Sequence, residues 1–422
     1  MSEFKDAPAG ASVLEKTTVW FENRFPTAFA EYKKHLSEYY APKNFNWWYF
    51  FGSLALLVLV IQIVTGIFLV MHYKPDANLA FASVEYIMRD VPWGWLIRYM
   101  HSTGASAFFI VVYLHMFRGM IYGSYRKPRE LVWIFGCLIF LCLMAEAFMG
   151  YLLPWGQMSY WGAQVIVSLF GAVPGFGAEL VEWIRGDYFI SDITLNRFFA
   201  LHVAAVPLAL ILLVVMHILA LHETGSLNPD GIEIKERKDA RGIPLDGVAF
   251  HPYYTAKDLV AIVIFLALFA AVIFFAPEMG GYFLEHANFE PANMLKTPEH
   301  IAPVWYFTPF YAILRSVPSK GWGAFLMLMA IVLLFFLPWL DRCRVKSIRY
   351  RGTTYKLALG MFVISFVALG YLGLQPATEK VYVYAARMFA SLYFLFFLLM
   401  PFYTRAEKTR AVPERVVYTA SH

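Results

Sequence analysis

The chain has 422 residues, of which 59% are hydrophobic, 18% aromatic and only 15% charged, and its net charge is +5. A soluble protein needs roughly a quarter of its residues charged to cover its surface. The composition therefore excludes a disordered chain, a nucleic-acid-binding protein and an ordinary cytosolic enzyme, and it predicts an all-α protein that crosses a membrane several times.

Eight apolar stretches are long enough to cross about 30 Å of hydrocarbon as helices. The polar residues before the first stretch form an arm, in which we expect a surface helix near 27–40. Most Lys and Arg residues lie in this arm, in alternate connections and in the C-terminal tail, so the positive-inside rule places both termini in the cytoplasm. The predicted spans are 47–72, 95–122, 131–152, 198–221, 257–276, 322–340, 356–374 and 385–404.

This topology divides the chain into five segments. Two long connections, 153–197 and 277–321, lie on the positive side of the membrane and are rich in Trp, Tyr, Pro and Gly. Loops of that length in a compact protein usually carry function. The segments are a cytoplasmic arm (1–46), a four-helix bundle (47–221), a cytoplasmic connection (222–256), the C-terminal helices (257–405) and a cytoplasmic tail (406–422).

Four histidines lie inside two of the apolar spans, where a polar ring is costly and usually functional. His101 and His115 are 14 residues apart on the second span, and His202 and His217 are 15 apart on the fourth. Each spacing covers about 21 Å of helix and returns both rings to nearly the same face. Pro207 can distort the fourth span enough to absorb the extra residue. The spacing predicts two facing pairs, His101 with His202 and His115 with His217, each of which can hold the iron of one haem.

Glycines and arginines support the haem prediction. Gly52 and Gly66 on the first span, and Gly136 and Gly150 on the third, are each 14 residues apart, which repeats the histidine spacing. We interpret these glycines as places where a porphyrin lies against the helix backbone; close helix packing is the alternative. Arg98 and Arg118, each three residues outside a histidine, are candidate partners of haem propionates. No Cys-x-x-Cys-His motif is present, so the predicted haems are not covalently attached.

These residues resemble the cytochrome b family, the membrane core subunit of quinol–cytochrome c reductase, over about residues 25 to 405. The resemblance is specific in order and spacing. It implies two non-covalent b haems, of lower potential at His101 and His202 and of higher potential at His115 and His217. The matching runs are Arg98-Tyr-Met-His101, Tyr113-Leu-His115, Gly150-Tyr-Leu-Leu-Pro-Trp-Gly-Gln157, Phe198-Phe-Ala-Leu-His202, His222-Glu-Thr-Gly225, His251-Pro-Tyr-Tyr254, Pro303-Val-Trp-Tyr306 and Ala312-Ile-Leu-Arg-Ser316.

The resemblance also implies two quinone sites and a division of electrons between them. Quinol oxidised on the positive side gives one electron to a Rieske-type iron–sulfur partner, and the other crosses the two haems to quinone on the negative side. This cycle contributes to the proton-motive force. The positive-side site corresponds to Phe148, Tyr151, Gly162, Pro303, Val304, Trp305, Tyr306 and Tyr311, and the negative-side site to His222, Ser226 and Asp258, with Lys257 as a candidate for proton uptake.

One residue departs from the family pattern at the positive-side site. The motif usually reads Pro-Glu-Trp-Tyr, whereas Val304 stands here in place of the carboxylate. Valine cannot accept a proton from quinol. Glu146 is the only acidic residue well inside a predicted span, and a carboxylate there is costly unless it is paired or functional. We expect Glu146 to take the proton-accepting role; a structural hydrogen bond to a neighbouring helix is the alternative.

The family further implies a cytochrome c1-type partner, quinones and lipids as ligands, and a homodimeric complex. The long basic connection at 222–256 and the N-terminal arm favour a bacterial protein of the inner membrane. Two alternatives remain at this point: a di-haem membrane anchor of a quinone-linked dehydrogenase, and a proton-coupled transporter whose histidines relay protons. The halves of the chain show no clear repeat of the kind that transporters have.

Overall fold

Eight helices long and apolar enough to cross a membrane form the body of this computed structural model, which describes residues 6–27, 30 and 38–417. Each lies within a few residues of a predicted span, so the prediction of an all-α multi-pass membrane protein is confirmed. A helix suits these apolar stretches because it satisfies every backbone polar group within the segment. The spans are Trp47–Val70, Gly94–Tyr122, Glu130–Leu152, Asp192–Thr224, Phe250–Phe275, Lys320–Leu340, Thr353–Gly373 and Lys380–Leu398.

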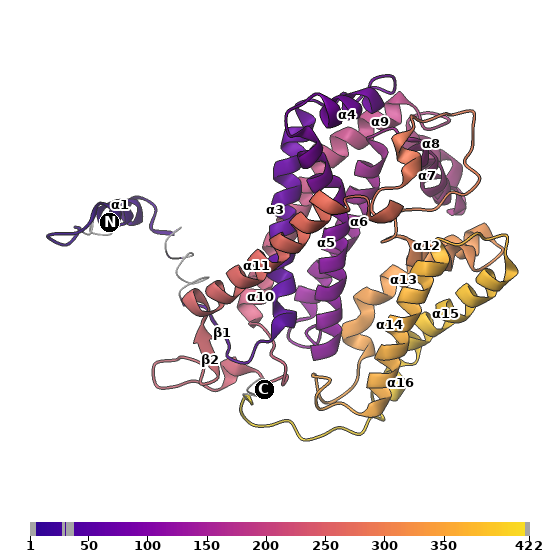
Figure 1. Cartoon of the computed structure of the whole chain (residues 1–422). Coiled ribbons are helices and arrows are strands. Elements are labelled where there is room, and N and C mark those ends of the chain that lie inside the picture. The colour runs from indigo at the N-terminus through magenta and orange to yellow at the C-terminus, as the bar shows by residue number, and fades with distance from the viewer. Residues whose placement is uncertain (1–5, 28–29, 31–37, 418–422) are drawn as a thin grey trace.

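The first four spans form one half of the body, in which α3 (Phe51–Val70) packs along α5 (Gly94–Tyr122) and α6 (Glu130–Leu152) along α10 (Val206–Thr224). Figure 1 shows this half in indigo to magenta, with α11 (Phe250–Phe275) crossing beside it. We call the end with α4 (Ala80–Arg89) the upper end and the opposite end the lower end, as they appear there.

The fourth span contains an irregular turn at the position that the histidine spacing indicated. α9 (Asp192–Ala200) continues into a π-helical segment, Leu201–Ala205, and then into α10, whose first turn contains Pro207. A π turn holds one more residue than an α turn, and proline has no N–H to donate to the preceding turn. This turn absorbs the additional residue of the spacing, so the predicted distortion near Pro207 is confirmed.

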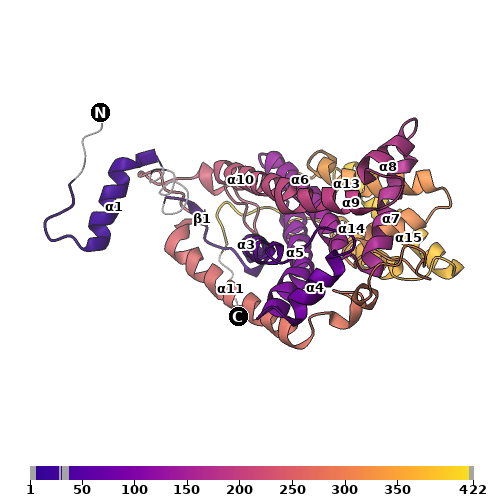
Figure 2. The same cartoon turned by 90° about the horizontal axis from the view of Figure 1, so that it is seen from above.

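The C-terminal spans and the segments between the two halves complete the body. Figure 2 shows α13 to α15 on one side of the first four spans and α11 on the other. Upper-end helices α7, α8 and α9 lie over the junction of the two halves (Figure 1). The remaining helices are α7 (Gln157–Leu169), α8 (Gly177–Arg185), α12 (Thr308–Arg315), α13 (Lys320–Leu340), α14 (Thr353–Gly373), α15 (Lys380–Leu398) and α16 (Met400–Tyr403).

The N-terminal arm differs from the expectation. It contains α1 (Val13–Arg24), which begins at a capping box formed by Ser12 and Glu15. Most of the surface helix expected near 27–40 lies outside the described residues. Tyr40–Pro42 forms strand β1, which pairs antiparallel with β2 (Gly247–Ala249), so the predicted helix is wrong at residue 40.

Ion pairs connect the C-terminal tail to the lower end of the body. The side chain of Asp246 is almost fully buried and receives Lys43 Nζ at 2.8 Å and Arg415 Nε at 2.7 Å. Burial alone would raise the pKa of this carboxyl, but the hydrogen bonds from Arg415 and Lys43 outweigh it and lower the pKa to about 2. Asp246 therefore joins the arm, the 222–256 connection and the tail.

Candidate functional site

The four predicted histidines meet as two pairs inside the first four spans. The ring centres of His101 and His202 lie 6.2 Å apart, and those of His115 and His217 lie 6.3 Å apart. This is the separation expected when one metal ion lies between two imidazoles at about 2 Å from each nitrogen. Two facing imidazoles at this distance suit a metal whose other ligands come from a cofactor. The described residues contain no cluster of three or more His, Cys, Asp or Glu that could hold a metal ion.

Hydrogen bonds fix the orientation of three of the four rings. Nδ1 of His101 lies 2.9 Å from the Thr65 hydroxyl, and Nδ1 of His217 lies 2.9 Å from the Val132 carbonyl oxygen. Nδ1 of His202 lies 3.0 Å from the carbonyl oxygen of Glu146. Occupied Nδ1 atoms leave Nε2 as the free nitrogen, an arrangement typical of histidines that bind metals. Nδ1 of His115 is buried and has no partner among the described residues.

The four glycines explain why rings fit between the helices. A Cβ atom on Gly66 would lie 3.3 Å from the His101 ring, and one on Gly52 would lie 3.3 Å from the His115 ring. On the third span, a Cβ on Gly136 would lie 3.4 Å from His217, and one on Gly150 only 2.4 Å from His202. We predicted a porphyrin face at these glycines, and the structure places one histidine ring at each. The spacing of the glycines follows that of the histidines because each glycine makes room for one histidine ring.

Both predicted arginines carry buried nitrogens without a partner. Nη1 of Arg98 and Nε of Arg118 form no hydrogen bond within the part of the chain that the structure describes. Unsatisfied buried guanidinium nitrogens are costly, which points to an anionic group that belongs beside them. The guanidinium of Arg118 also lies 4.8 Å from the centre of the Tyr49 ring. Two arginines near two histidine pairs suit a cofactor that carries carboxylates at its edge.

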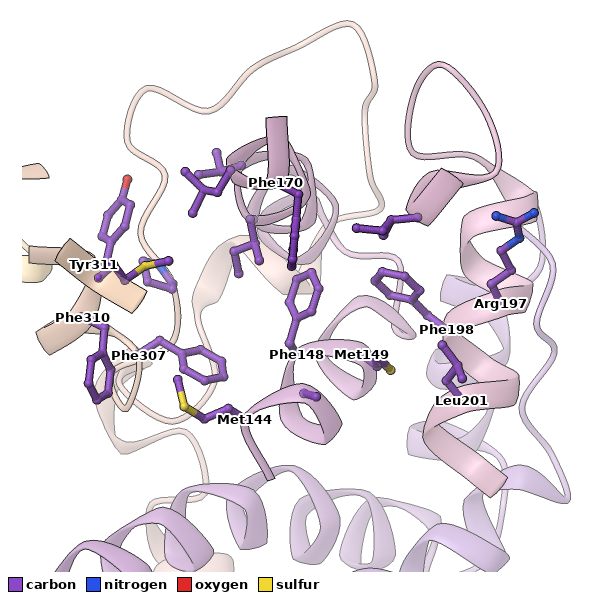
Figure 3. Close-up of a pocket in the computed structure, with 18 of the residues that line it drawn as sticks. Met144, Phe148, Met149, Phe170, Arg197, Phe198, Leu201, Phe307, Phe310 and Tyr311 are labelled. Atoms are coloured by element: carbon purple, nitrogen blue, oxygen red, sulfur yellow. The ribbon is translucent and has the colours of Figure 1, made fainter. Parts of the chain in front are cut away.

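A large apolar cavity of about 810 Å³ opens at the upper end of the body. Figure 3 shows Phe148 in its centre, with Phe307 on one side and Phe198 on the other. Polar groups are few, and they include Tyr311 and Arg197 at its edges (Figure 3). A mainly apolar cavity with few polar groups suits a hydrophobic ligand. Of the residues predicted for this site, Phe148, Gly162, Pro303 and Tyr311 line it.

The other predicted residues of this site lie behind the cavity wall. Val304 and Tyr306 are buried in the main core, and the Tyr306 ring stacks on Phe109 at 4.0 Å. Trp305 donates from Nε1 to the hydroxyl of Ser106 at 3.0 Å. Tyr151 lies against Gly162, whose Cβ position would be 3.6 Å from the tyrosine ring. The run from 303 to 306 therefore shapes the wall through Pro303 and anchors it through the next three residues.

Glu146 lies beside a histidine of the upper pair. Its Oε1 atom is 3.0 Å from Nδ1 of His202, and its Oε2 atom is buried without a partner among the described residues. Its neighbours Met144, Ala145 and Phe148 line the cavity. The carboxyl group thus contacts the upper histidine pair on a stretch of α6 that also lines the cavity, and one oxygen is free to accept a proton or a hydrogen bond.

The predicted negative-side residues form two small groups at the lower end. His222 stacks on Tyr39 at 4.4 Å, and the Tyr39 hydroxyl lies 2.9 Å from that of Ser226. Asp258 on α11 accepts a hydrogen bond from Ser53 at 3.0 Å. Lys257 donates to the Tyr253 hydroxyl at 2.8 Å. Tyr39 is a residue that sequence reasoning missed, because it belongs to none of the recognised runs.

Sequence reasoning also missed Glu285, which lies in the loop between the fifth and sixth spans. Its Oε2 atom accepts a hydrogen bond from the Tyr151 hydroxyl at 2.9 Å. Burial of this carboxyl raises its pKa to about 7. No sequence signal distinguishes Glu285 from the other acidic residues of this loop, because its burial depends on how the loop folds over α6.

Comparison with known proteins finds related family models for both halves of the chain. Residues 36–225 match the sequence model of the family described as cytochrome b/b6/petB, and residues 291–394 match that described as cytochrome b (C-terminal)/b6/petD. Cytochrome b of Allochromatium vinosum is 63% identical over 94% of this chain and 97% of its own length.

Two further comparisons concern larger assemblies. A Bradyrhizobium diazoefficiens protein named cytochrome b/c1 is 46% identical over 94% of this chain, but the chain covers only 56% of it. A solved structure described as a hyperthermophilic respiratory complex III contains a chain that is 41% identical, with a TM-score of 0.83, over 90% of this chain and 97% of that one.

Proposed function

Because this chain belongs to the cytochrome b family and is the cytochrome b subunit of a respiratory quinol–cytochrome c reductase, we propose that its two histidine pairs hold two b haems. The observation that carries this proposal is the separation of 6.2 Å and 6.3 Å between paired rings. Three rings held through Nδ1, buried arginine nitrogens without a partner and the close approach of each ring to a glycine all support it. Family membership also decides against the dehydrogenase anchor and the transporter.

The residues around each pair have distinct tasks. His101 and His202 would hold the haem of lower potential near the upper end, and His115 and His217 the haem of higher potential near the lower end. Arg98 and Arg118 would pair with propionates, which are the anionic edge of a haem. When bound, the haems supply one-electron transfer between the two ends of the bundle.

We further propose that quinol is oxidised in the cavity at the upper end, which faces the positive side of the membrane. The apolar wall, with Phe148 at its centre, suits a quinol ring and its isoprenoid chain. Tyr311 at the edge of this cavity can orient a quinol oxygen. Glu146, with one free carboxylate oxygen, is the proposed proton acceptor that compensates for Val304.

At the lower end, His222, Ser226 and Asp258 are the proposed contacts of a quinone that is being reduced. Their hydroxyl, imidazole and carboxyl groups can donate to the two carbonyl oxygens of a quinone and supply protons. Lys257 on the same turn of α11 as Asp258 is the proposed entry point for protons from the negative side. The stacking of Tyr39 on His222 would hold the imidazole in place.

We propose partners and a location for this chain from its place in the respiratory quinol–cytochrome c reductase. A Rieske-type iron–sulfur protein would take the first electron of quinol, and a cytochrome c1-type subunit would follow it. The Bradyrhizobium relative named cytochrome b/c1 supports the second partner. We place the chain in a bacterial inner membrane, within a homodimeric complex in contact with lipids, and with both termini in the cytoplasm.

Replacement of one histidine tests the haem proposal. In the purified complex, His202→Ala should remove about half of the b-type absorbance in a reduced-minus-oxidised spectrum and abolish quinol–cytochrome c activity, because only the lower pair stays complete. His72→Ala, outside both pairs, is the control and should keep both signals. A spectrum unchanged by His202→Ala would contradict the proposed ligand.

A further inference from the structure

Three side chains form a closed hydrogen-bonded group at the upper end of α6. The Tyr151 hydroxyl donates to Glu285 Oε2 at 2.9 Å, and Asn288 Nδ2 donates to the Tyr151 oxygen at 2.9 Å and to Glu285 Oε2 at 3.4 Å. Asn288 also accepts from the backbone N–H of Ser159 at 2.8 Å, which fixes the loop to α7. This group joins a phenol that packs beside the cavity to a carboxyl in the loop above it.

The group lies next to the cavity and not within it. Gly162 lines the cavity, and its missing side chain leaves the Tyr151 ring directly behind that wall. Burial raises the pKa of the Tyr306 hydroxyl, and the nearby Glu285 carboxylate adds to this rise. Val304, buried nearby in the same loop, offers no acceptor. Glu285 is therefore the ionisable carboxyl that the loop brings to this side of the cavity.

The same loop reaches the surface directly after Glu285. The next residue, His286, has a side chain that is 73% exposed, and its Nδ1 atom lies 3.9 Å from Oε2 of Glu278. Glu278 in turn accepts a hydrogen bond from the Tyr99 hydroxyl at 3.3 Å. The loop residue that follows Glu285 thus carries an exposed imidazole, and this imidazole has a second carboxylate near it at the surface.

We infer that Glu285, reached through Tyr151, receives one of the two protons released by quinol in this cavity and passes it to the upper surface through His286. This inference rests on the proposed quinol-oxidation site. Oxidation of quinol to quinone releases two electrons, which go to the iron–sulfur partner and to the bundle, and two protons. Tyr151 would take a proton from quinol as it gives its own to Glu285, so its charge does not change. Because two protons leave, Glu146 and Glu285 can each accept one.

The ionisation of Glu285 suits this task. A general base works best when its pKa lies close to the working pH, and burial raises the pKa of Glu285 to about 7. The groups facing it are Tyr151 from α6, and Asn288 and Tyr306 from the loop. Above pH 7 the carboxylate is free to accept a proton, and below pH 7 it is already protonated. Turnover should therefore rise with pH between about 6 and 8.

The test uses the purified complex with quinol and cytochrome c between pH 5.5 and 9. Glu285→Gln keeps an oxygen that accepts the Tyr151 hydrogen bond but cannot take a proton. We expect turnover to fall about a hundredfold at pH 8, with loss of the rise near pH 7 and with both haem signals intact. Glu285→Asp should recover part of the rate, with the rise at lower pH. Glu290→Gln, an exposed carboxylate in the same loop, is the matched control and should behave as the wild type.

The outcomes separate the inference from the function on which it rests. Wild-type rate and pH profile in Glu285→Gln would overturn the inference alone, and so would a lower rate with an unchanged profile, since that indicates a structural role. If Glu285→Gln lost its haem signals, Tyr151→Phe would decide, and an unchanged pH profile there would overturn the relay. A wild-type complex without quinol–cytochrome c activity would instead reject the proposed function.

Discussion

Nδ1 of His202 lies 3.0 Å from both the backbone oxygen and the carboxylate Oε1 of Glu146. One residue of the third span therefore contacts a proposed haem ligand with both its backbone and its side chain, and its neighbour Ala145 lines the proposed quinol cavity. The second oxygen of that side chain has no partner among the described residues. This arrangement links the position of the upper histidine pair to the position of a possible proton acceptor.

Glu146→Gln should slow quinol oxidation about tenfold while both haem spectra stay intact. The amide keeps an oxygen for His202 but cannot accept a proton, and a positioned general base contributes at least this much to the rate. Stopped-flow reduction of the haems by quinol measures the effect. Glu179→Gln, an exposed carboxylate on α8, is the control. Normal rates in Glu146→Gln would leave only a structural role for this carboxyl.

Three glycine-to-alanine changes should rank by the space around each Cβ. Gly150→Ala places a methyl group 2.4 Å from the His202 ring and should expel or tilt that ring, with loss of most of the upper haem signal. Gly136→Ala, at 3.4 Å from His217, should lose little. Gly360→Ala on α14 meets nothing within 4 Å and is the control. Equal haem content in all three variants, measured by pyridine haemochrome, would contradict the packing argument.

Asp258→Asn should impair quinone reduction at the lower end without affecting quinol oxidation at the upper end. The amide keeps a contact with Ser53 but cannot deliver a proton to quinone. We expect the lower haem to be reduced at the normal rate and reoxidised about tenfold more slowly. Flash-induced haem kinetics separate the two steps. Slow reduction with normal reoxidation would place Asp258 outside this site.

Asp246→Asn should loosen the C-terminal tail by about 2 kcal/mol, because two charge-assisted hydrogen bonds lose their anion. The pKa of Asp246 is lowered from 3.8 to about 2, so its stabilising effect is complete above pH 4 and is lost as the pH falls through 2. Relative to pepsin's rate on an unstructured peptide at the same pH, cleavage of the wild-type tail should accordingly be faster at pH 2 than at pH 4, and that of the variant equal at both. Glu414→Gln, which changes an exposed ion pair, is the control.

Much of this structure could be predicted because hydrocarbon imposes strict rules on sequence. Apolar length fixed the eight spans, and matching histidine intervals identified the two facing pairs. A distortion near Pro207 was also predicted from the one extra residue between His202 and His217, and the structure shows it as a π turn at Leu201–Ala205. These features depend on helical periodicity, which can be counted along a sequence.

Features that depend on packing between distant segments could not be predicted. The glycines were predicted from their spacing, but which histidine ring each one faces, such as His202 at Gly150 and His101 at Gly66, depends on helix rotation. Tyr39 reaches His222 through the folding of the arm, and Glu285 reaches Tyr151 through that of a long loop. Neither the path of the arm nor that of the loop can be inferred from a repeated spacing or an apolar span in the sequence.

The pairing of the first four spans has a consequence for biogenesis. α3 packs along α5 and α6 along α10, whereas the two hairpin-like pairs touch each other only sparsely within the described chain. Each histidine couple draws one imidazole from α5 and one from the fourth span, where His202 lies in the π-helical segment and His217 in α10. A porphyrin bound there would connect the two helix pairs. Insertion of iron porphyrin into the newly made subunit should therefore close the bundle and protect it from quality-control proteases.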